Sequence, residues 1–235
     1  MTKGLFAALE VCHDCTPRSA AMNMAIDEVL LETAAIPSIR FYRWNSPALS
    51  FGYFGNLADV ASYARARDLV RRWTGGGIVF HGEDLTYSIV IPASDPIFAE
   101  SSRSIYEKIH CALRDALTAN DARVELAAMG RDAALRRPRT AQRAVPTNVC
   151  FANPVSADVM VNGQKVAGAA QRRTRSGLLH QGSIQHVDLG NGFAERFAKE
   201  LSNNCEMGAL PEAVHDRAQE IAAEKYATNA WLRKR

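Results

Sequence analysis

Hydrophobic and polar positions follow two different periods along the chain, and these periods divide it into helices and strands. In residues 101–119 apolar side chains recur every three to four positions, with Ile105, Ile109, Leu113 and Leu117 on one stripe, which is typical of a helix that buries one face. Helices are also expected over 19–34, 56–67, 194–201 and 212–226. Runs that contain β-branched and aromatic residues predict strands over 5–11, 39–44, 48–53, 69–73, 85–92, 157–161, 165–171 and 178–187.

The predicted strands come in runs with helices inserted between them, which favours an α+β fold. Asn162-Gly163 is the strongest turn signal in the chain and predicts a hairpin between 157–161 and 165–171. This order is typical of a mixed, largely antiparallel sheet flanked by helices. The 235 residues, 47% of them hydrophobic, are enough for one full core, so we expect a single domain over 1–235.

The net charge and its distribution along the chain limit the kinds of partner that we expect. The formal net charge is +3, near neutral for this size, which argues against a nucleic-acid partner. Positive charge is nevertheless concentrated in a loop predicted over 129–147. This arginine-rich segment either binds an acidic partner or is simply a loop exposed to solvent. Its arginines are Arg131, Arg136, Arg137, Arg139 and Arg143.

The chain shows no sign of export or of a membrane. The N-terminus lacks the apolar core and cleavage site of a signal peptide, and no apolar run approaches the roughly 18–20 residues that span a bilayer. The five cysteines have no disulfide-framework spacing, so we expect a cytoplasmic protein. Cys12 and Cys15 lack a second Cys-x-x-Cys pair, so we expect no metal site.

A glycine-rich segment is the first candidate for a binding site. The chain reads Arg71-Arg72-Trp73-Thr74-Gly75-Gly76-Gly77-Ile78-Val79-Phe80-His81. Successive glycines expose backbone N–H groups to a ligand, and the two arginines can pair with an anion. A flexible turn would use the same glycines. The segment is neither a Walker loop nor a dinucleotide fingerprint, because the following Gly-Lys-Ser/Thr and the required glycine spacing are both absent.

Three further positions carry residue types that suit chemistry. Lys165 follows the predicted turn and has small residues around it. Either another group packs closely against this strand, or Lys165 is an ordinary solvent-exposed strand residue. Cys150 lies between the arginine-rich segment and Lys165; it is either a small core residue or a thiol activated by a nearby cation. The strand predicted over 178–187 contains His180, Gly182 and Ser183, which either line a site or follow a sheet edge.

Taken together and in order, these motifs resemble the lipoate-protein ligase and octanoyltransferase superfamily. That family carries Arg-Arg-x-Ser/Thr-Gly-Gly-Gly-x-Val-x-His, then Lys-x-x-Gly-x-Ala, and later a His-Gly-Ser element. Here the last element reads His180-Gln181-Gly182-Ser183, where the family usually has Gln-His-Gly-Ser. Residues 23–28, Tyr226 and Trp231 extend the resemblance to almost the whole chain.

The resemblance implies a class II aminoacyl-synthetase-like and biotin-ligase-like catalytic domain. Lys165 would match the lysine that holds the acyl carbonyl. Gly168 would border the acyl pocket together with Gly182 and Ser183, and His180 belongs to the same element. The glycine segment would line the pocket through Arg72, Thr74, Gly75, Gly76, Gly77, Ile78, Val79, Phe80 and His81.

One motif separates two branches of this family. Cysteine-type octanoyltransferases carry Cys-Phe-x-x-Pro before the lysine motif, and residues 150–154 read Cys-Phe-Ala-Asn-Pro. ATP-dependent lipoate ligases instead tend to carry Arg-Asn-Asp seven residues before the lysine, whereas this chain has Ser156-Ala157-Asp158. Ligases also usually have an accessory C-terminal domain, which we do not expect here. Both features favour the transferase.

The resemblance then implies a two-step acyl transfer without a cofactor. Cys150 would accept an octanoyl group from octanoyl-acyl carrier protein, and a lysine of a lipoyl carrier domain would receive it. The acceptor would be a domain such as a glycine cleavage H protein or a dehydrogenase E2 domain. Two alternatives stay open: a ligase that activates free lipoate with ATP and Mg²⁺, and a non-catalytic protein that binds acyl groups or carrier domains.

Overall fold

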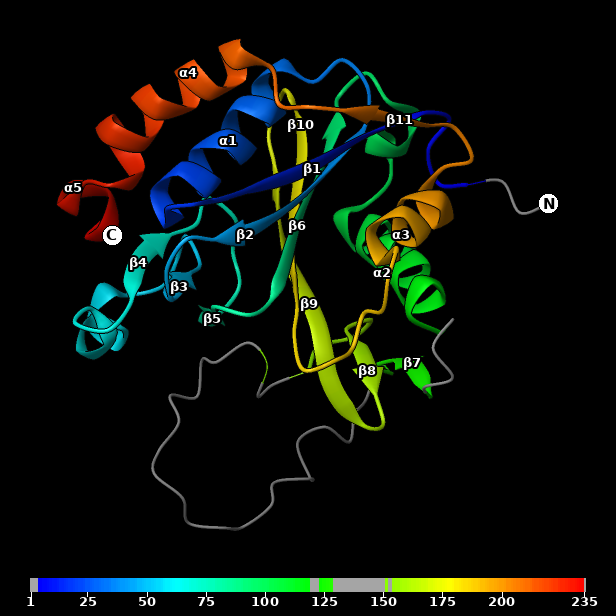
Figure 1. The fold of residues 1–235 in the computed structure, drawn as a ribbon, viewed down its shortest axis with the longest axis horizontal. Helices are drawn as coiled ribbons and strands as arrows, with labels where there is room; N and C mark the ends of the chain where they lie inside the picture. The colour runs from blue at the N-terminus through cyan, green and yellow to red at the C-terminus, as the bar shows by residue number, and fades with distance from the viewer. Residues whose placement is uncertain (1–3, 119–122, 129–150, 152–153, 235) are drawn as a thin grey trace.

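The computed structural model describes residues 4–118, 123–128, 151 and 154–234, and the fold is built on one large sheet (Figure 1). Its strands lie in the order β11-β1-β2-β6-β10-β9-β8-β7. Their bounds are β11 Cys205–Gly208, β1 Leu9–Arg18, β2 Ser38–Trp44, β6 Leu85–Pro92, β10 Gly177–Ile184, β9 Gln164–Arg173, β8 Val159–Val161 and β7 Val124–Leu126. β1 is parallel to both β11 and β2, and every other pairing in this sheet is antiparallel.

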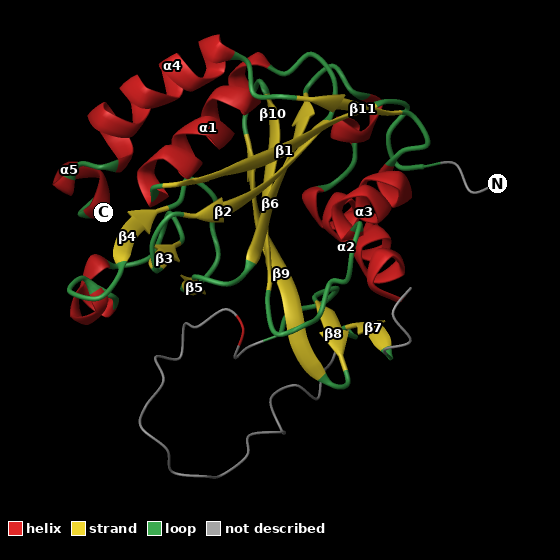
Figure 2. Ribbon diagram, in the orientation of Figure 1, coloured by secondary structure: helices red, strands yellow, loops and turns green. Residues whose placement is uncertain are grey.

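A smaller sheet carries the glycine-rich segment. It has the order β4-β3-β5, with β4 Asp68–Arg71, β3 Ala48–Phe51 and β5 Val79–His81. The glycines connect β4 to β5 on either side of the central strand β3. This arrangement sets the glycine-rich segment beside the main sheet, as Figure 2 shows.

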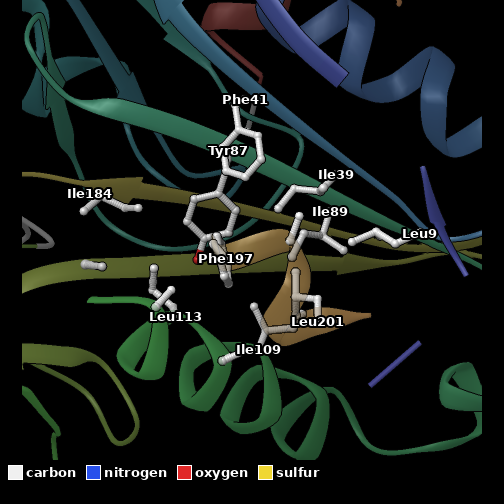
Figure 3. Packing of buried hydrophobic residues seen from close by; sticks show 14 of the residues in the cluster. Leu9, Ile39, Phe41, Tyr87, Ile89, Ile109, Leu113, Ile184, Phe197 and Leu201 are labelled. Atoms are coloured by element: carbon white, nitrogen blue, oxygen red, sulfur yellow. The ribbon is translucent and has the colours of Figure 1, made fainter. Parts of the chain in front are cut away.

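Helices cover both faces of the main sheet. They are α1 Ala20–Thr33, α2 Ser102–Thr118, α3 Phe193–Leu201, α4 Glu212–Ile221 and α5 Asn229–Leu232, with a π-helical turn η5 Ala222–Tyr226 after α4. The predicted stripe of α2 packs on one face: Ile109 and Leu113 meet Phe197 and Leu201 of α3 over Tyr87 (Figure 3). α1 packs against the opposite face, around Tyr42 and Trp44, and α4 packs on the outer side of α1. We call these the α2 face and the α1 face.

The predicted α+β fold with a mixed, largely antiparallel sheet is confirmed. The helix predicted over 19–34 begins after Ser19, whose hydroxyl accepts a hydrogen bond from the amide of Met22 at 3.3 Å. The predicted hairpin turns at Asn162 and Gly163, which have φ angles of 50° and 78°. The Asn-Gly turn signal and the strand-like runs therefore predicted the hairpin and most strands of the main sheet.

The helix predicted over 56–67 is wrong, and the predicted first strand begins later than residue 5. Residues 57–63 form two short 3₁₀ turns, η1 Leu57–Asp59 and η2 Ala61–Tyr63. Leu57, Val60 and Tyr63 recur every three residues and pack together, which suits the three-residue turn of a 3₁₀ helix. A further 3₁₀ turn, η3 Pro96–Ala99, precedes α2, and β5, β7 and β11 were not predicted. The loop predicted over 129–147, including the arginine-rich segment, lies outside the described residues.

Candidate active site

A pocket on the α1 face of the sheet brings the sequence motifs together. Its empty space, counted together with the part that opens to solvent, is about 410 Å³. Its apolar wall includes Met24 of α1, Trp44 of β2 and Val79 of β5, and its small-residue wall is Ala169-Ala170 of β9. Polar side chains from β3, β5, β6 and β10 complete the lining: Ser50, His81, Thr86, Gln181 and Ser183. This lining gives the pocket one apolar side and one polar side.

The polar side chains at one end of the pocket bond to one another. Arg72 donates to the hydroxyl of Ser50 at 2.6 Å, and that hydroxyl lies 2.7 Å from Nε2 of His81. Nδ1 of His81 lies 2.8 Å from Asp84, whose carboxylate also accepts from the hydroxyls of Thr86 and Ser183. These bonds occupy the polar atoms, so this wall can face an apolar chain at low cost.

Asp84 is the charged member of this network. Burial disfavours its charged form, but hydrogen bonds from His81, from the Gly82 amide and from Ser183 outweigh burial and lower the pKa of Asp84 to about 2. Burial lowers the pKa of His81, and its bond to Asp84 offsets only part of that shift. A neutral His81 therefore donates from Nδ1 to Asp84 and accepts from Ser50 at Nε2, while the ring of Trp44 stacks on it at 4.0 Å.

The two arginines before the glycines hold backbone carbonyls. Arg72 donates to the carbonyls of Gly75 and Gly77 at 3.0 and 2.8 Å. Arg71 is buried and donates to four carbonyls, two of them in Trp231 and Leu232 near the end of the described chain. Anion pairing was the role suggested by sequence, whereas these bonds fix the shape of the glycine-rich segment.

The glycine-rich segment also depends on Gly52, which directly follows β3. Gly76 has a φ angle of 84°, which favours glycine. A Cβ atom on Gly52 would lie 2.1 Å from the Gly76 carbonyl oxygen, so the two segments pack closer than any side chain allows. Gly52 was not singled out in the sequence, because its contact is with a segment more than twenty residues away.

Gln181 connects the glycine-rich segment to α1. Its amide oxygen accepts from the hydroxyl of Thr74 at 2.8 Å, and its amide nitrogen donates to Asp27 at 2.7 Å. His180, the neighbouring predicted residue, points to the opposite face, where Nδ1 lies 3.0 Å from the Gln171 amide nitrogen. Side chains of a strand alternate between its two faces, so in this chain Gln181 faces the pocket and the predicted His180 does not.

Lys165 lies at the end of the pocket wall in a buried ion pair. Its ammonium is 2.7 Å from Asp158, and both side chains are almost fully buried. A Cβ atom on Gly168 would lie 2.7 Å from Nζ of Lys165, so the glycine makes room for the lysine. Val159 opposes Ala167 while Met160 opposes Lys165, which leaves Val166 as an extra residue in β9. This irregularity places Lys165 beside Gly168 rather than on the opposite face.

Two other groups hold Asp158 in place. The hydroxyl of Tyr106 on α2 donates to Asp158 at 2.6 Å, and the amide of Val155 donates at 2.7 Å. The same hydroxyl accepts from the amide of Ala169 at 3.2 Å. Burial and the Asp158 charge raise the pKa of Tyr106, so it acts as a neutral donor. Sequence reasoning missed Tyr106, since nothing in a helical stripe marks one tyrosine as different.

The structure brings together only part of the predicted site. Of the predicted residues, Arg72, Gly76, Val79, His81, Gly168, Gly182 and Ser183 line the pocket. Gly77 and Ile78 line a neighbouring groove, while Phe80 packs against Tyr63. Gly182 also makes room for the ring of Tyr87, because a Cβ atom on Gly182 would lie 2.2 Å from Cζ of that ring. Cys150 lies outside the described residues, but the ring of Phe151, the next residue, is centred 5.5 Å from Nζ of Lys165.

The described residues contain no group of three or more His, Cys, Asp or Glu side chains placed to bind a metal ion. In the part of the chain that the structure covers, no helix is both long enough and apolar enough to cross a bilayer.

The fold is that of lipoate-protein ligases. A crystal structure of lipoate-protein ligase A bound with ATP superimposes with a TM-score of 0.69 at 20% identity, covering 97% of this chain and 98% of that one. A bipartite lipoate protein ligase from Thermoplasma acidophilum, studied with its E2 lipoyl domain, gives a TM-score of 0.63 at 19% identity and covers 97% and 96% of the two chains.

Sequence comparison then defines the family. Residues 19–222 match the lipoyl protein ligase A/B catalytic domain, and the chain belongs to this family. Octanoyltransferase LipM of Oceanobacillus iheyensis is 37% identical over 72% of this chain and 61% of its own length. Octanoyltransferase LipM of Brevibacillus brevis is 34% identical over 91% of this chain and 94% of its own length. The predicted superfamily is therefore confirmed.

Proposed function

We propose that the protein is an octanoyltransferase that moves an octanoyl group from octanoyl-acyl carrier protein to a lysine of a lipoyl carrier domain. Both named relatives are octanoyltransferases, 37% and 34% identical to this chain. The observation that carries the proposal is Lys165, buried beside Asp158 and Gly168 at the end of the pocket that the sequence motifs line.

Lys165 has the position needed to bind the acyl carbonyl. The pocket leads along β9 from Ala170 to Gly168, and Gly168 is in contact with the lysine side chain. An ammonium at this position attracts the negative charge that develops on a carbonyl oxygen during attack, and burial strengthens the attraction. Asp158 fixes the lysine so that little reorganisation is needed when that charge appears.

We propose Cys150 as the nucleophile of a two-step transfer. In the first step its thiolate attacks the carbonyl of the thioester, a new carbon–sulfur bond forms, and the donor thiolate leaves and takes a proton. In the second step the amine of the acceptor lysine attacks, an amide forms, its proton is lost, and the Cys150 thiolate is released. The Cys-Phe-x-x-Pro pattern and the contact between Phe151 and Lys165 support this assignment.

The proposed reaction uses no cofactor and places the protein in the cytoplasm, where acyl carrier proteins supply the donor. An acceptor of the lipoyl-domain class fits the family, whose Thermoplasma acidophilum member was studied with an E2 lipoyl domain. We also propose that residues 1–235 act as one catalytic domain. The ligase alternative would need ATP with Mg²⁺ and free lipoate, and would not need Cys150.

The test is octanoyl transfer to a purified lipoyl domain, followed by mass spectrometry with and without ATP. The proposal expects full transfer from octanoyl-acyl carrier protein without ATP. Modification that requires both free acid and ATP would establish the ligase instead. Binding of both carrier proteins without any transfer would support the non-catalytic alternative.

A further inference from the structure

A second groove lies on the other side of β9 from the acyl pocket. It lies between α2, residues 155–157 and the edge of β9, and its empty space, counted together with the part that opens to solvent, is about 710 Å³. Ser102 and Tyr106 line it from α2, and Val155, 58% exposed, lines it from the opposite wall. The groove shares Ala169 and Ala170 with the acyl pocket, so the two spaces adjoin across one strand.

The edge of β9 along this groove has unpaired peptide groups among the described residues. β8 pairs with β9 as far as Ala167, and the amide of Ala169 bonds to Tyr106 on that same side. Since peptide groups alternate along a strand, Gln171 directs its N–H and C=O to this side too. No described backbone group pairs with the Ala169 carbonyl or with the peptide groups of Gln171 on this side. We call these positions the open edge of β9.

We infer that this groove binds the amide-bearing pantetheine arm of the donor thioester. The inference rests on the proposed octanoyl transfer, because that donor has an apolar chain on one side of its carbonyl and a polyamide arm on the other. With the acyl chain in the pocket and the carbonyl at Lys165, the arm must leave near Asp158 and Tyr106. That position is where the groove begins.

The chemistry of the groove matches the arm rather than a second apolar chain. An extended segment with alternating amides can bond to an open strand edge as an added strand does. The Ala169 and Ala170 side chains are small enough for a close approach, and the Tyr106 ring and Val155 supply apolar contact for the methylene groups between amides. Binding energy from the arm would then position the thioester carbonyl for attack.

The experiment compares two octanoyl thioesters as acyl donors to the enzyme, octanoyl-pantetheine and octanoyl-N-acetylcysteamine, the second of which has a truncated arm. We expect kcat/KM to be on the order of tenfold or more higher for octanoyl-pantetheine in the wild-type protein. Ser156→Trp, an exposed position in the groove wall, should reduce kcat/KM for octanoyl-pantetheine to that of the short thioester. It should leave the reaction with octanoyl-N-acetylcysteamine unchanged.

Ser176→Trp is the matched control, since Ser176 is an exposed serine in the turn that ends β9, outside the groove lining. It should react like the wild type with both donors. Equal kcat/KM for the two donors in the wild type, or equal losses for both donors in Ser156→Trp, would overturn the inference about the arm. If neither thioester acylates the wild-type protein, the proposed octanoyl transfer itself fails.

Discussion

The ammonium of Lys165 lies 2.7 Å from the carboxylate of Asp158, with both side chains excluded from solvent. Tyr106 and the Val155 amide complete the bonds of the carboxylate. A buried ion pair of this kind costs desolvation energy, so it is weak as a source of stability and is better explained by a need for a fixed charge. Here the fixed charge lies next to the acyl pocket.

Replacing Lys165 with arginine should keep the charge and lose the reaction. The guanidinium is larger and planar, and the space bounded by Gly168 and Asp158 is shaped for a lysine. We expect kcat/KM for octanoyl transfer to fall roughly 100-fold or more, as when an oxyanion donor is misplaced. Lys108→Arg, which changes an exposed lysine on α2, is the control and should transfer normally. Wild-type turnover by Lys165→Arg would remove the lysine from the mechanism.

Gly168→Ala tests the position of the lysine without changing any charge. The new methyl group would lie 2.6 Å from Cε and 2.7 Å from Nζ of Lys165, and the lysine, a flexible side chain, would move away. Displacement by about 1 Å can cost roughly 100-fold in rate, so we expect a large loss of kcat with little change in melting temperature. Gly82→Ala, where a Cβ meets open space, is the matched control. Equal activity in the two variants would contradict the packing argument.

Gly52→Ala should damage the glycine-rich segment from a distance. A Cβ at this position would lie 2.1 Å from the Gly76 carbonyl oxygen, and backbone on both sides leaves little freedom to adjust. We expect a loss of about 1–3 kcal/mol in the free energy of unfolding, together with weaker acyl binding. Urea unfolding and the KM for octanoyl-acyl carrier protein measure the two effects. An unchanged unfolding midpoint would show that the segment is looser than its contacts indicate.

Acid should destabilise the protein before its carboxylates are protonated. Burial lowers the pKa of His81 and His180, and it lowers that of His110 to about 4. Below the ordinary histidine pKa near 6.5 the unfolded chain therefore binds more protons than the folded one, so stability falls as pH drops from about 6.5 towards 4. Each such histidine contributes a slope of up to about 1.4 kcal/mol per pH unit.

Urea unfolding between pH 7.5 and 4.5 measures this slope. His110→Phe removes one of the groups and should flatten the dependence, even though the variant is less stable at pH 7.5 because the Ala157 carbonyl loses its donor. The same slope in this variant would mean that His110 does not titrate as its burial requires.

Much of the site followed from sequence because its motifs are continuous. The glycine-rich segment is one continuous run, Lys165 and Gly168 belong to a second short motif, and the structure brings Arg72, His81 and Gly168 to one pocket. The pairing of Lys165 with Asp158 was not predicted, although Asp158 had been noted. It depends on the irregularity at Val166, which no alternation pattern reveals.

Positions that depend on packing between distant segments could not be predicted. Gln181 faces the pocket while His180 faces α2, and only the strand register decides between two adjacent polar residues. Ser50 and Asp84 complete the network around His81 from separate strands and turns. Leu57, Val60 and Tyr63 were assigned to an α-helix because the residues around them have high helix propensity, yet packing selected 3₁₀ turns.

In the proposed reaction Cys150 carries the octanoyl group as a thioester. Intact mass spectrometry of the protein after mixing with octanoyl-acyl carrier protein, without ATP, detects this intermediate. We expect a gain of one octanoyl mass on the wild type that hydroxylamine removes, and no gain on Cys150→Ala. Cys12→Ala, at a buried cysteine whose pKa burial raises to about 11, should acquire the octanoyl mass like the wild type. Octanoyl attached to Cys150→Ala, or full ATP-dependent ligation by that variant, would show that Cys150 is not the nucleophile.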